Sequence, residues 1–136
     1  MALRYEEIKI GDVHSFERVI DEEAVNRFAE LTGDKNPLHM NEEYARKTEF
    51  GGRIAHGMLA GSLFSTLVGM FCPGERALYL SQKVNFRKPI RLGEKIKIQG
   101  EVIKKSDALK TITLSTKIIN DKNQVVIDGE AMAKVR

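Results

Sequence analysis

The second half of the chain alternates hydrophobic and polar residues, which is the pattern of strands with one buried and one exposed face. Ile96 and Ile98 alternate with lysines, and Ile112 and Leu114 alternate with threonines. Short polar stretches separate these runs and are typical of turns. The pattern predicts four successive strands that form an antiparallel meander, over residues 76–86, 95–103, 109–119 and 124–135.

The segment 56–71 is the most hydrophobic part of the chain and is interrupted only by Ser, Thr and three glycines. Apolar residues on most of its sides predict a buried helix, closely wrapped by other elements. It is too short and too polar to span a bilayer. Because the apolar face of the sheet must be covered, we predict an α+β hotdog fold: a long, curved antiparallel β-sheet wrapped around a central buried α-helix.

The first part of the chain predicts a strand and two helices. Residues 14–20 alternate as a strand does, and Asp21 precedes Glu22 and Glu23 as a helix N-cap would. The apolar residues that follow share one face of a helix, at Ala24, Val25, Phe28, Ala29 and Leu31. Asn41 is the expected cap of a second helix over 42–47. The glycines of the run 50–53 then allow a close approach of backbone.

The loop between these two helices carries the densest chemistry, in the run Leu31-Thr32-Gly33-Asp34-Lys35-Asn36-Pro37-Leu38-His39. Gly33 is suited to end a helix in the left-handed conformation, and Pro37 stiffens the backbone around Asn36. Asp34 and His39 are therefore predicted to face one small molecule as an acid and a base. Taken alone, the same residues also fit an ordinary turn with capping side chains.

The start of the central helix is the second candidate region. Its first backbone N–H groups have no partner within the helix and can receive an oxygen that gains negative charge. Gly57 has no side chain to keep that oxygen away. We interpret His56 as a structural residue at the helix start rather than a catalytic one, Ser62 and Ser65 as helix-packing hydroxyls, and His14 as a surface residue.

Composition narrows the function classes. The 136 residues suit one domain, 1–136, and the net charge of +3 is dispersed, so no nucleic-acid-binding arm is predicted. The only cysteine, Cys72, excludes an internal disulfide and fits a reducing compartment. The polar, acidic N-terminus carries no signal peptide pattern, so we expect a cytoplasmic protein without a membrane segment.

The sequence lacks the motifs of several other classes of enzyme. The sequence has no Gly-x-Ser-x-Gly elbow, no phosphate-binding loop and no dinucleotide fingerprint. Its three histidines and one cysteine have no zinc-site spacing, so no metal is predicted, and no base flanks Cys72 to make it a nucleophile. The reaction class that remains is general acid–base catalysis beside a polarised carbonyl.

The sequence resembles the hydratase 2 motif of (R)-specific enoyl-CoA hydratases in the MaoC-like family. The resemblance rests on the run 28–39 with its Asp-x-Asn-Pro-x-His core and on Ile54-Ala55-His56-Gly57-Met58-Leu59. It continues through Ser62-Leu63-Phe64-Ser65 and Phe86-Arg87-Lys88-Pro89 to Gly93-Glu94. Among members of the family, the short form is most similar to hydratases that supply polyhydroxyalkanoate synthesis.

The resemblance implies reversible hydration of trans-2-enoyl-CoA to (R)-3-hydroxyacyl-CoA, with an acyl-CoA thioester as substrate, no cofactor and a homodimer of hotdog subunits. It assigns catalysis to Asp34 and His39, thioester binding to the Gly57 N–H, and supporting roles to Asn36 and Ser65. Which of Asp34 and His39 takes the proton from water stays open, as does the preferred acyl-chain length.

Two alternatives share the predicted fold. A hotdog thioesterase would hydrolyse the thioester, and a non-catalytic acyl-CoA-binding subunit would keep the pocket without turnover. The pairing of Asp34 with His39 argues against both.

Overall fold

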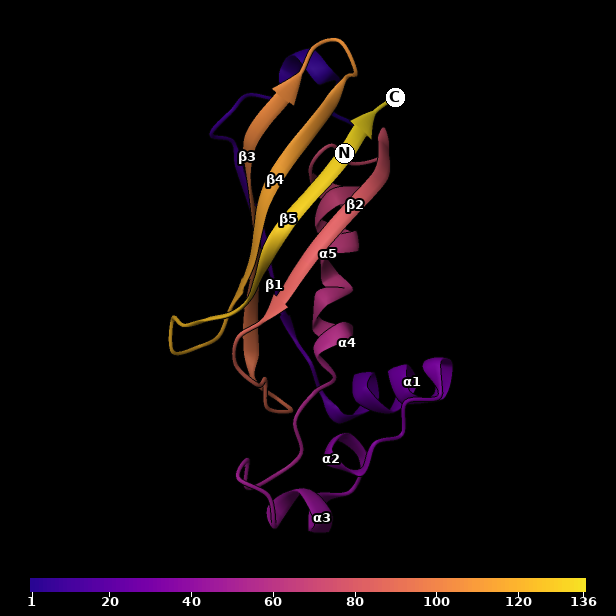
Figure 1. Ribbon diagram of the computed structural model, residues 1–136, viewed down its shortest axis with the longest axis vertical. Helices are drawn as coiled ribbons and strands as arrows, with labels where there is room; N and C mark the ends of the chain where they lie inside the picture. Colours follow the sequence, from indigo (N-terminus) through magenta and orange to yellow (C-terminus); the bar gives the residue numbers. More distant parts are fainter.

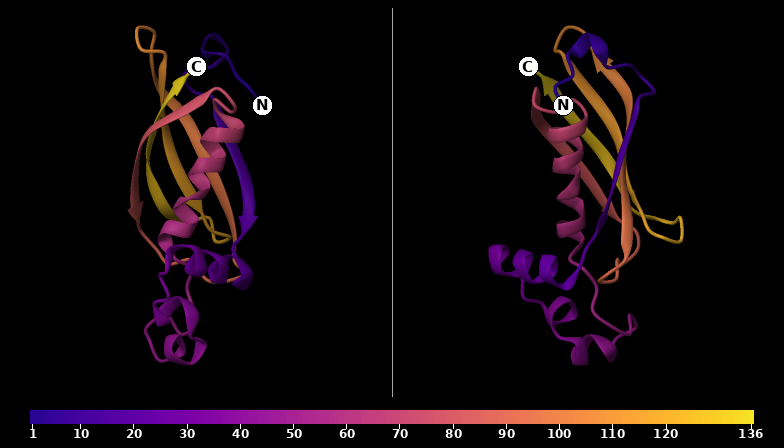
Figure 2. Two further views of the ribbon diagram at one scale, coloured as in Figure 1. Left: turned by 90° about the vertical axis from the view of Figure 1, so that its right-hand side faces the viewer. Right: turned by 180° about the vertical axis from the view of Figure 1, so that it is seen from behind.

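The computed structural model describes residues 1–136 and contains one five-stranded antiparallel sheet in the order β1-β3-β4-β5-β2. The strands are β1 (Val13–Val19), β2 (Ala77–Phe86), β3 (Lys95–Ser106), β4 (Thr111–Ile119) and β5 (Val125–Val135). The sheet curves around a helix that lies along its concave face (Figures 1 and 2). The α+β hotdog prediction is therefore confirmed.

The predicted meander of four successive strands is wrong at its first member. β3, β4 and β5 are consecutive neighbours, but β2 pairs with β5, from Ala77 opposite Val135 to Phe86 opposite Ile127. The segment 87–94 carries the chain from β2 to β3 at the far side of the sheet, where β3 also pairs with β1. Neighbouring strands in sequence usually pair when the connection is a tight turn, and this connection is too long to impose that.

The central helix begins at Gly57 and runs as α4 (Gly57–Gly61), α5 (Leu63–Thr66) and the π-helical turn η2 (Leu67–Phe71). Phe64, Leu67 and Val68 are fully or almost fully buried against the sheet. The prediction of a helix buried on most sides was too strong, because Met58, Ser62, Ser65 and Met70 form an exposed face. None of the helices has the length and hydrophobicity of a membrane-spanning segment.

Three further helices gather at one end of the sheet, next to the start of α4 (Figure 2). They are α1 (Glu22–Thr32), α2 (Pro37–Met40) and α3 (Glu42–Arg46), and the short 3-10 turn η1 (Tyr5–Glu7) lies near the N-terminus. The Asp21 side chain caps α1 by accepting from the Ala24 N–H, and Asn41 caps α3 by accepting from the Tyr44 N–H. Both predicted caps are confirmed.

The core has two parts along the central helix. One contains Phe64, Leu67 and residues of β3 and β5, and it extends to Val25 of α1. The other contains Val68 and Cys72 with residues of β3, β4 and β5 at the opposite end. The first part anchors α1, and with it the loop that leads to Asp34, to the start of the central helix.

Candidate active site

The loop after α1 has a defined backbone. Gly33 adopts φ 81°, and its N–H donates to the Ala29 carbonyl at 2.8 Å, which ends the helix in the left-handed conformation. The Asn36 N–H then donates to the Asp34 carboxylate at 3.2 Å, and the Asn36 side chain accepts from the Leu38 N–H at 3.0 Å. Asn36 therefore fixes the loop and begins α2, with Pro37 at its first position.

His39 has one ring nitrogen committed to the protein. Its Nδ1 lies 2.8 Å from the Ile54 carbonyl oxygen. Because a carbonyl only accepts, Nδ1 carries the proton of this bond, and in the neutral imidazole Nε2 is then the unprotonated nitrogen. The fold thus presets the tautomer of His39.

His56 is buried, with only 2 % of its surface exposed. Its Nε2–H donates to the Asp34 carbonyl at 3.0 Å, and its ring packs 4.1 Å from the His39 ring, centroid to centroid. Nδ1 has no hydrogen-bond partner. His56 makes no cap on its own helix, so its structural role, which the sequence indicated, is exerted on the Asp34 loop instead.

These groups border a cavity of about 430 Å³ between the loop, the start of α4 and the end of β2. Asp34, His39 and Gly57 line it together with apolar side chains, which include Phe50, Ile54, Met58, Phe86 and Ile90. A Cβ on Gly57 would lie 2.7 Å from the Phe86 ring, so only glycine fits beside that ring without displacing it. The sequence-predicted acid, base and helix-start glycine therefore meet at one cavity.

The comparison with known proteins identifies the family of the chain. Residues 7–124 match the family described as MaoC like domain. The chain belongs to the MaoC-like family. It is 39% identical over 134 residues to a 3-hydroxybutyryl-CoA dehydratase of Methylorubrum extorquens. The match covers 98% of this chain and 84% of that protein.

Other relatives agree with this assignment. The chain is 37% identical over 131 residues to an (R)-specific enoyl-CoA hydratase of Rhodospirillum rubrum, with 96% of this chain and 90% of that protein covered. The solved structure of the (R)-hydratase from A. caviae involved in PHA biosynthesis superposes with a TM-score of 0.94 at 32% identity. The superposition covers 96% of this chain and 99% of that one. The predicted membership of the MaoC-like family is confirmed.

In this MaoC-like chain, the two residues for which the resemblance implied supporting roles lie outside the cavity lining. Asn36 acts on the loop backbone, as described above. Ser65 lies on the exposed face of the central helix, and its hydroxyl has no partner within the chain. Its supporting role stays a prediction.

Few side-chain atoms at the cavity are free to coordinate a metal ion. Asp34, His39 and His56 each offer an atom within 4.8 Å of the others. However, the Ile54 carbonyl occupies Nδ1 of His39, the Asp34 carbonyl occupies Nε2 of His56, and Nδ1 of His56 is enclosed. Asp34 and one His39 nitrogen remain, which is fewer than the three protein ligands typical of a catalytic zinc site.

The shifted pKa values of Cys72 and Asp128 bear on the candidate site. Burial raises the pKa of the Cys72 thiol to about 11, and Cys72 lies at the far end of the central helix, so a role as nucleophile has no support. Hydrogen bonds from Arg87, which lines the cavity, and from Asn85 hold the pKa of Asp128 below its ordinary value. Arg87 is therefore engaged by a carboxylate, whereas the neighbouring Lys88 side chain forms no ion pair.

No sequence pattern pointed to a role for Arg53, whose guanidinium donates to the His39 carbonyl from outside the cavity. The hydrogen bond from the His56 ring to the Asp34 backbone carbonyl was not predicted either. Both contacts bring a side chain to a backbone carbonyl, and no residue pattern specifies which carbonyl a side chain will reach.

Proposed function

We propose that this protein reversibly hydrates trans-2-enoyl-CoA thioesters to (R)-3-hydroxyacyl-CoA by acid–base catalysis with Asp34 and His39. The observation that carries the proposal is the meeting of both side chains with the Gly57 N–H at one largely apolar cavity. The names of the relatives support the same reaction class.

His39 is suited to move the proton. With Nδ1–H held by Ile54, its Nε2 accepts a proton from water as the water oxygen bonds to C3 of the enoyl group. The Asp34 carboxylate accepts a hydrogen bond from the same water and orients it. The proton then passes from Nε2 to C2, so that one water molecule has been added and both residues return to their starting states.

The intermediate is an enolate, because addition at C3 moves the C2–C3 π electrons onto the thioester oxygen. The Gly57 N–H has no acceptor within the protein and borders the cavity. One such donor at a developing oxyanion is typically worth about 3–4 kcal/mol of transition-state stabilisation. Because the Phe86 ring packs against Gly57, residue 57 has no room for a side chain, and its N–H stays open to the thioester oxygen.

The first test mixes the purified protein with crotonyl-CoA, follows the loss of the enoyl-thioester absorbance, and determines product configuration and free CoA. We expect (R)-3-hydroxybutyryl-CoA without CoA release. Free CoA would instead identify a thioesterase. Absence of turnover with both short and longer enoyl chains would reject the hydratase.

Variants of the acid–base pair test the residue roles. Asp34→Asn and His39→Ala should each lower kcat by about 10²–10⁴-fold, the usual range for a general acid or base, while circular dichroism shows a retained fold. His14→Ala is the matched control, because His14 lies on β1 and does not line the cavity. Turnover close to wild type in either site variant would reject its assignment.

We further propose that the protein is a homodimer and that it supplies (R)-3-hydroxyacyl-CoA to polyhydroxyalkanoate or fatty-acid metabolism in the cytoplasm. The relation to an (R)-hydratase involved in PHA biosynthesis supports the metabolic role. The exposed apolar side chains along β2 and the central helix support the dimer.

A further inference from the structure

Arg53 is a charged residue with a largely buried side chain, and the proposed mechanism does not use it. Its side chain is only 9% exposed, and it lies outside the lining of the cavity. It precedes Ile54, whose carbonyl holds Nδ1 of His39. A guanidinium removed from water is costly unless its donors are satisfied, so its partners indicate what it does.

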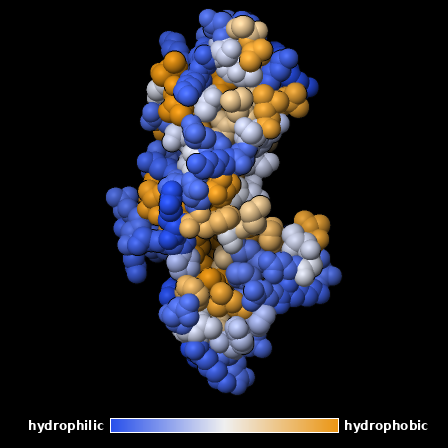
Figure 3. All heavy atoms as spheres, viewed as in Figure 1, coloured by the Kyte–Doolittle hydropathy of each residue, from blue (hydrophilic) through white to orange (hydrophobic).

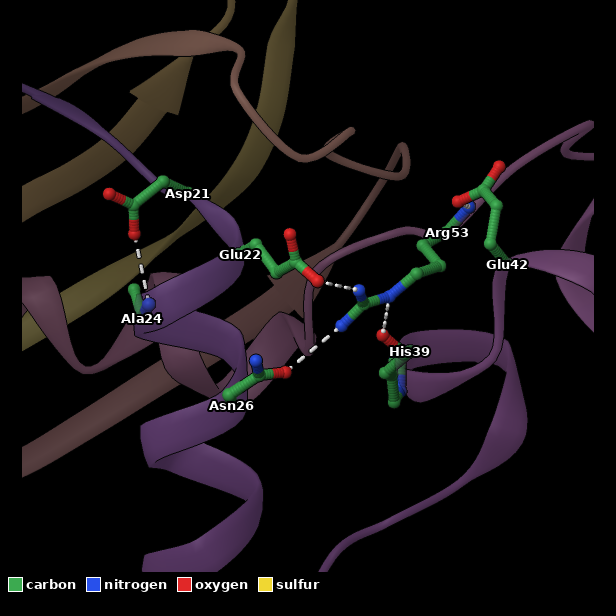
Figure 4. Close-up of polar contacts among 7 residues, drawn as sticks. All are labelled: Asp21, Glu22, Ala24, Asn26, His39, Glu42 and Arg53. Carbon is green, nitrogen blue, oxygen red and sulfur yellow. Dashed lines mark hydrogen bonds and ion pairs between the residues drawn. The ribbon is translucent and has the colours of Figure 1, made fainter.

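Each nitrogen of the guanidinium has its own acceptor (Figure 4). Nε–H donates to the His39 carbonyl at 2.5 Å. One terminal nitrogen donates to the Glu22 carboxylate at 3.1 Å and the other to the Asn26 side-chain oxygen at 3.2 Å. Arg53 thus joins the backbone of His39 on α2 to two side chains on α1.

The bond to His39 matters because α2 is short. A helix of four residues (Pro37–Met40) leaves its last carbonyls without partners in the helix, and it has little stability of its own. α1, in contrast, is capped at Asp21 and is anchored in the core by Val25 and Ala29. Arg53 therefore transfers the fixed position of α1 to the residue that bears the catalytic imidazole.

We propose that Arg53 is a positioning residue that holds His39 at the geometry required for proton transfer, an inference that rests on the proposed function. It acts through the His39 carbonyl and does not touch the substrate. The planar fork of arginine suits this role, because three acceptors in different directions are served by one rigid group. Lysine has a single ammonium and cannot reproduce that arrangement.

The principal experiment compares Arg53→Met with wild type on crotonyl-CoA. We expect kcat to fall by about 10²-fold, the scale of a misplacement of about 1 Å, with KM changed less than threefold. Arg53→Lys should recover no more than about a tenth of the lost activity. Arg27→Met is the matched control, because Arg27 forms an exposed ion pair with Glu23 on α1, the helix that Arg53 contacts. This variant should keep wild-type kcat.

A double variant separates positioning from general damage. If Arg53 acts through His39, Arg53→Met should have no further effect on kcat in a His39→Ala background. A further fall of about 10²-fold in that background would overturn the proposal. So would a folded Arg53→Met variant with kcat within twofold of wild type.

Two measurements keep the proposal testable if Arg53→Met fails to fold or if the protein is no hydratase. Asn26→Ala and Glu22→Gln each remove one anchor and should lower kcat about three- to tenfold; wild-type kcat in both would overturn the proposal. Independently of activity, ¹⁵N spectra of the histidines should report the Nδ1–H tautomer of His39 in wild type and a tautomer mixture in Arg53→Met. An unchanged His39 signal in that variant would overturn positioning by Arg53, whatever reaction the protein catalyses.

Discussion

Cys72 illustrates how a single residue couples burial to pH. The side chain has no exposed surface, and desolvation, with a smaller contribution from Asp12, raises its pKa from 9.0 to about 11. A pKa that is raised on folding means that the folded state keeps the proton longer than the unfolded state. Its contribution to stability is therefore complete below about pH 9 and is lost as the pH rises through 11.

We expect Cys72→Ala to reduce the alkaline loss of stability. Between pH 7 and pH 10.5 the free energy of unfolding in urea should fall by about 2 kcal/mol less in the variant than in wild type. The half-buried Tyr79, whose pKa is also raised to about 12, contributes in the same direction in both proteins and cancels in the comparison. Equal falls in the two proteins would show that the thiol is not protected by burial.

At the residue scale, the sequence was sufficient for groups whose role depends on their neighbours along the chain. Asp34 lies in the stiffened loop, His39 lies in the short helix α2 directly after it, and Gly57 begins a helix, so local chemistry identified all three as site candidates. The contacts of Arg53 and His56 span 14 and 22 residues to backbone carbonyls. Every residue offers such a carbonyl, so only the folded chain reveals which of them is bound.

Among the elements, the pairing of β2 with β5 depends on one close approach. Gly129 on β5 lies opposite Val84, and a Cβ there would come within 1.7 Å of the Lys83 carbonyl oxygen. Backbone atoms of a paired strand cannot move aside as a flexible side chain can. The two strands are therefore held at a separation that only glycine permits.

Gly129→Ala should separate β2 from β5 locally and destabilise the protein by about 1–3 kcal/mol, the usual cost of overpacking. Gly61→Ala on α4 is the control, because its Cβ would lie 3.7 Å from Val84, an ordinary contact. Alanine there should stabilise the helix by up to about 1 kcal/mol. Urea unfolding of both variants measures the difference, and equal stabilities would refute the close approach.

At this scale the sequence predicted the elements better than their arrangement. Caps at Asp21 and Asn41 and the helix end at Gly33 followed from local backbone chemistry. The alternation of residues located all five strands within a few residues of their ends. Alternation specifies which side of a strand is buried but not which strand lies next to it, and so the position of β2 was wrong.

For the whole molecule, exposed hydrophobic side chains are the notable surface feature. Leu78 and Leu80 on the edge strand β2 are each 49% exposed, and Met58 and Met70 on the central helix are exposed as well. Figure 3 shows hydrophobic patches on the face that carries these elements. Patches of this kind on an unpaired sheet edge are typical of surfaces that another chain covers.

We expect sedimentation equilibrium to give the mass of two chains. The double variant Leu78→Glu/Leu80→Glu should weaken the dimer at least tenfold, because each leucine buried on association contributes about 1.5–3 kcal/mol. Leu109→Glu, at a leucine in the turn before β4 that is 66% exposed, should leave the dimer intact. A monomeric wild-type protein would contradict the proposed assembly.

The strand order also governs when the sheet can be completed during synthesis. β2 leaves the ribosome well before β5, yet β5 is its only partner in the sheet. Until the last strand emerges, β2 and the central helix before it remain without their full cover, and their contacts are distant in sequence, which slows folding. A chain truncated within β5 would therefore present an open, apolar edge, and the arrival of β5 decides whether the nascent sheet closes or aggregates.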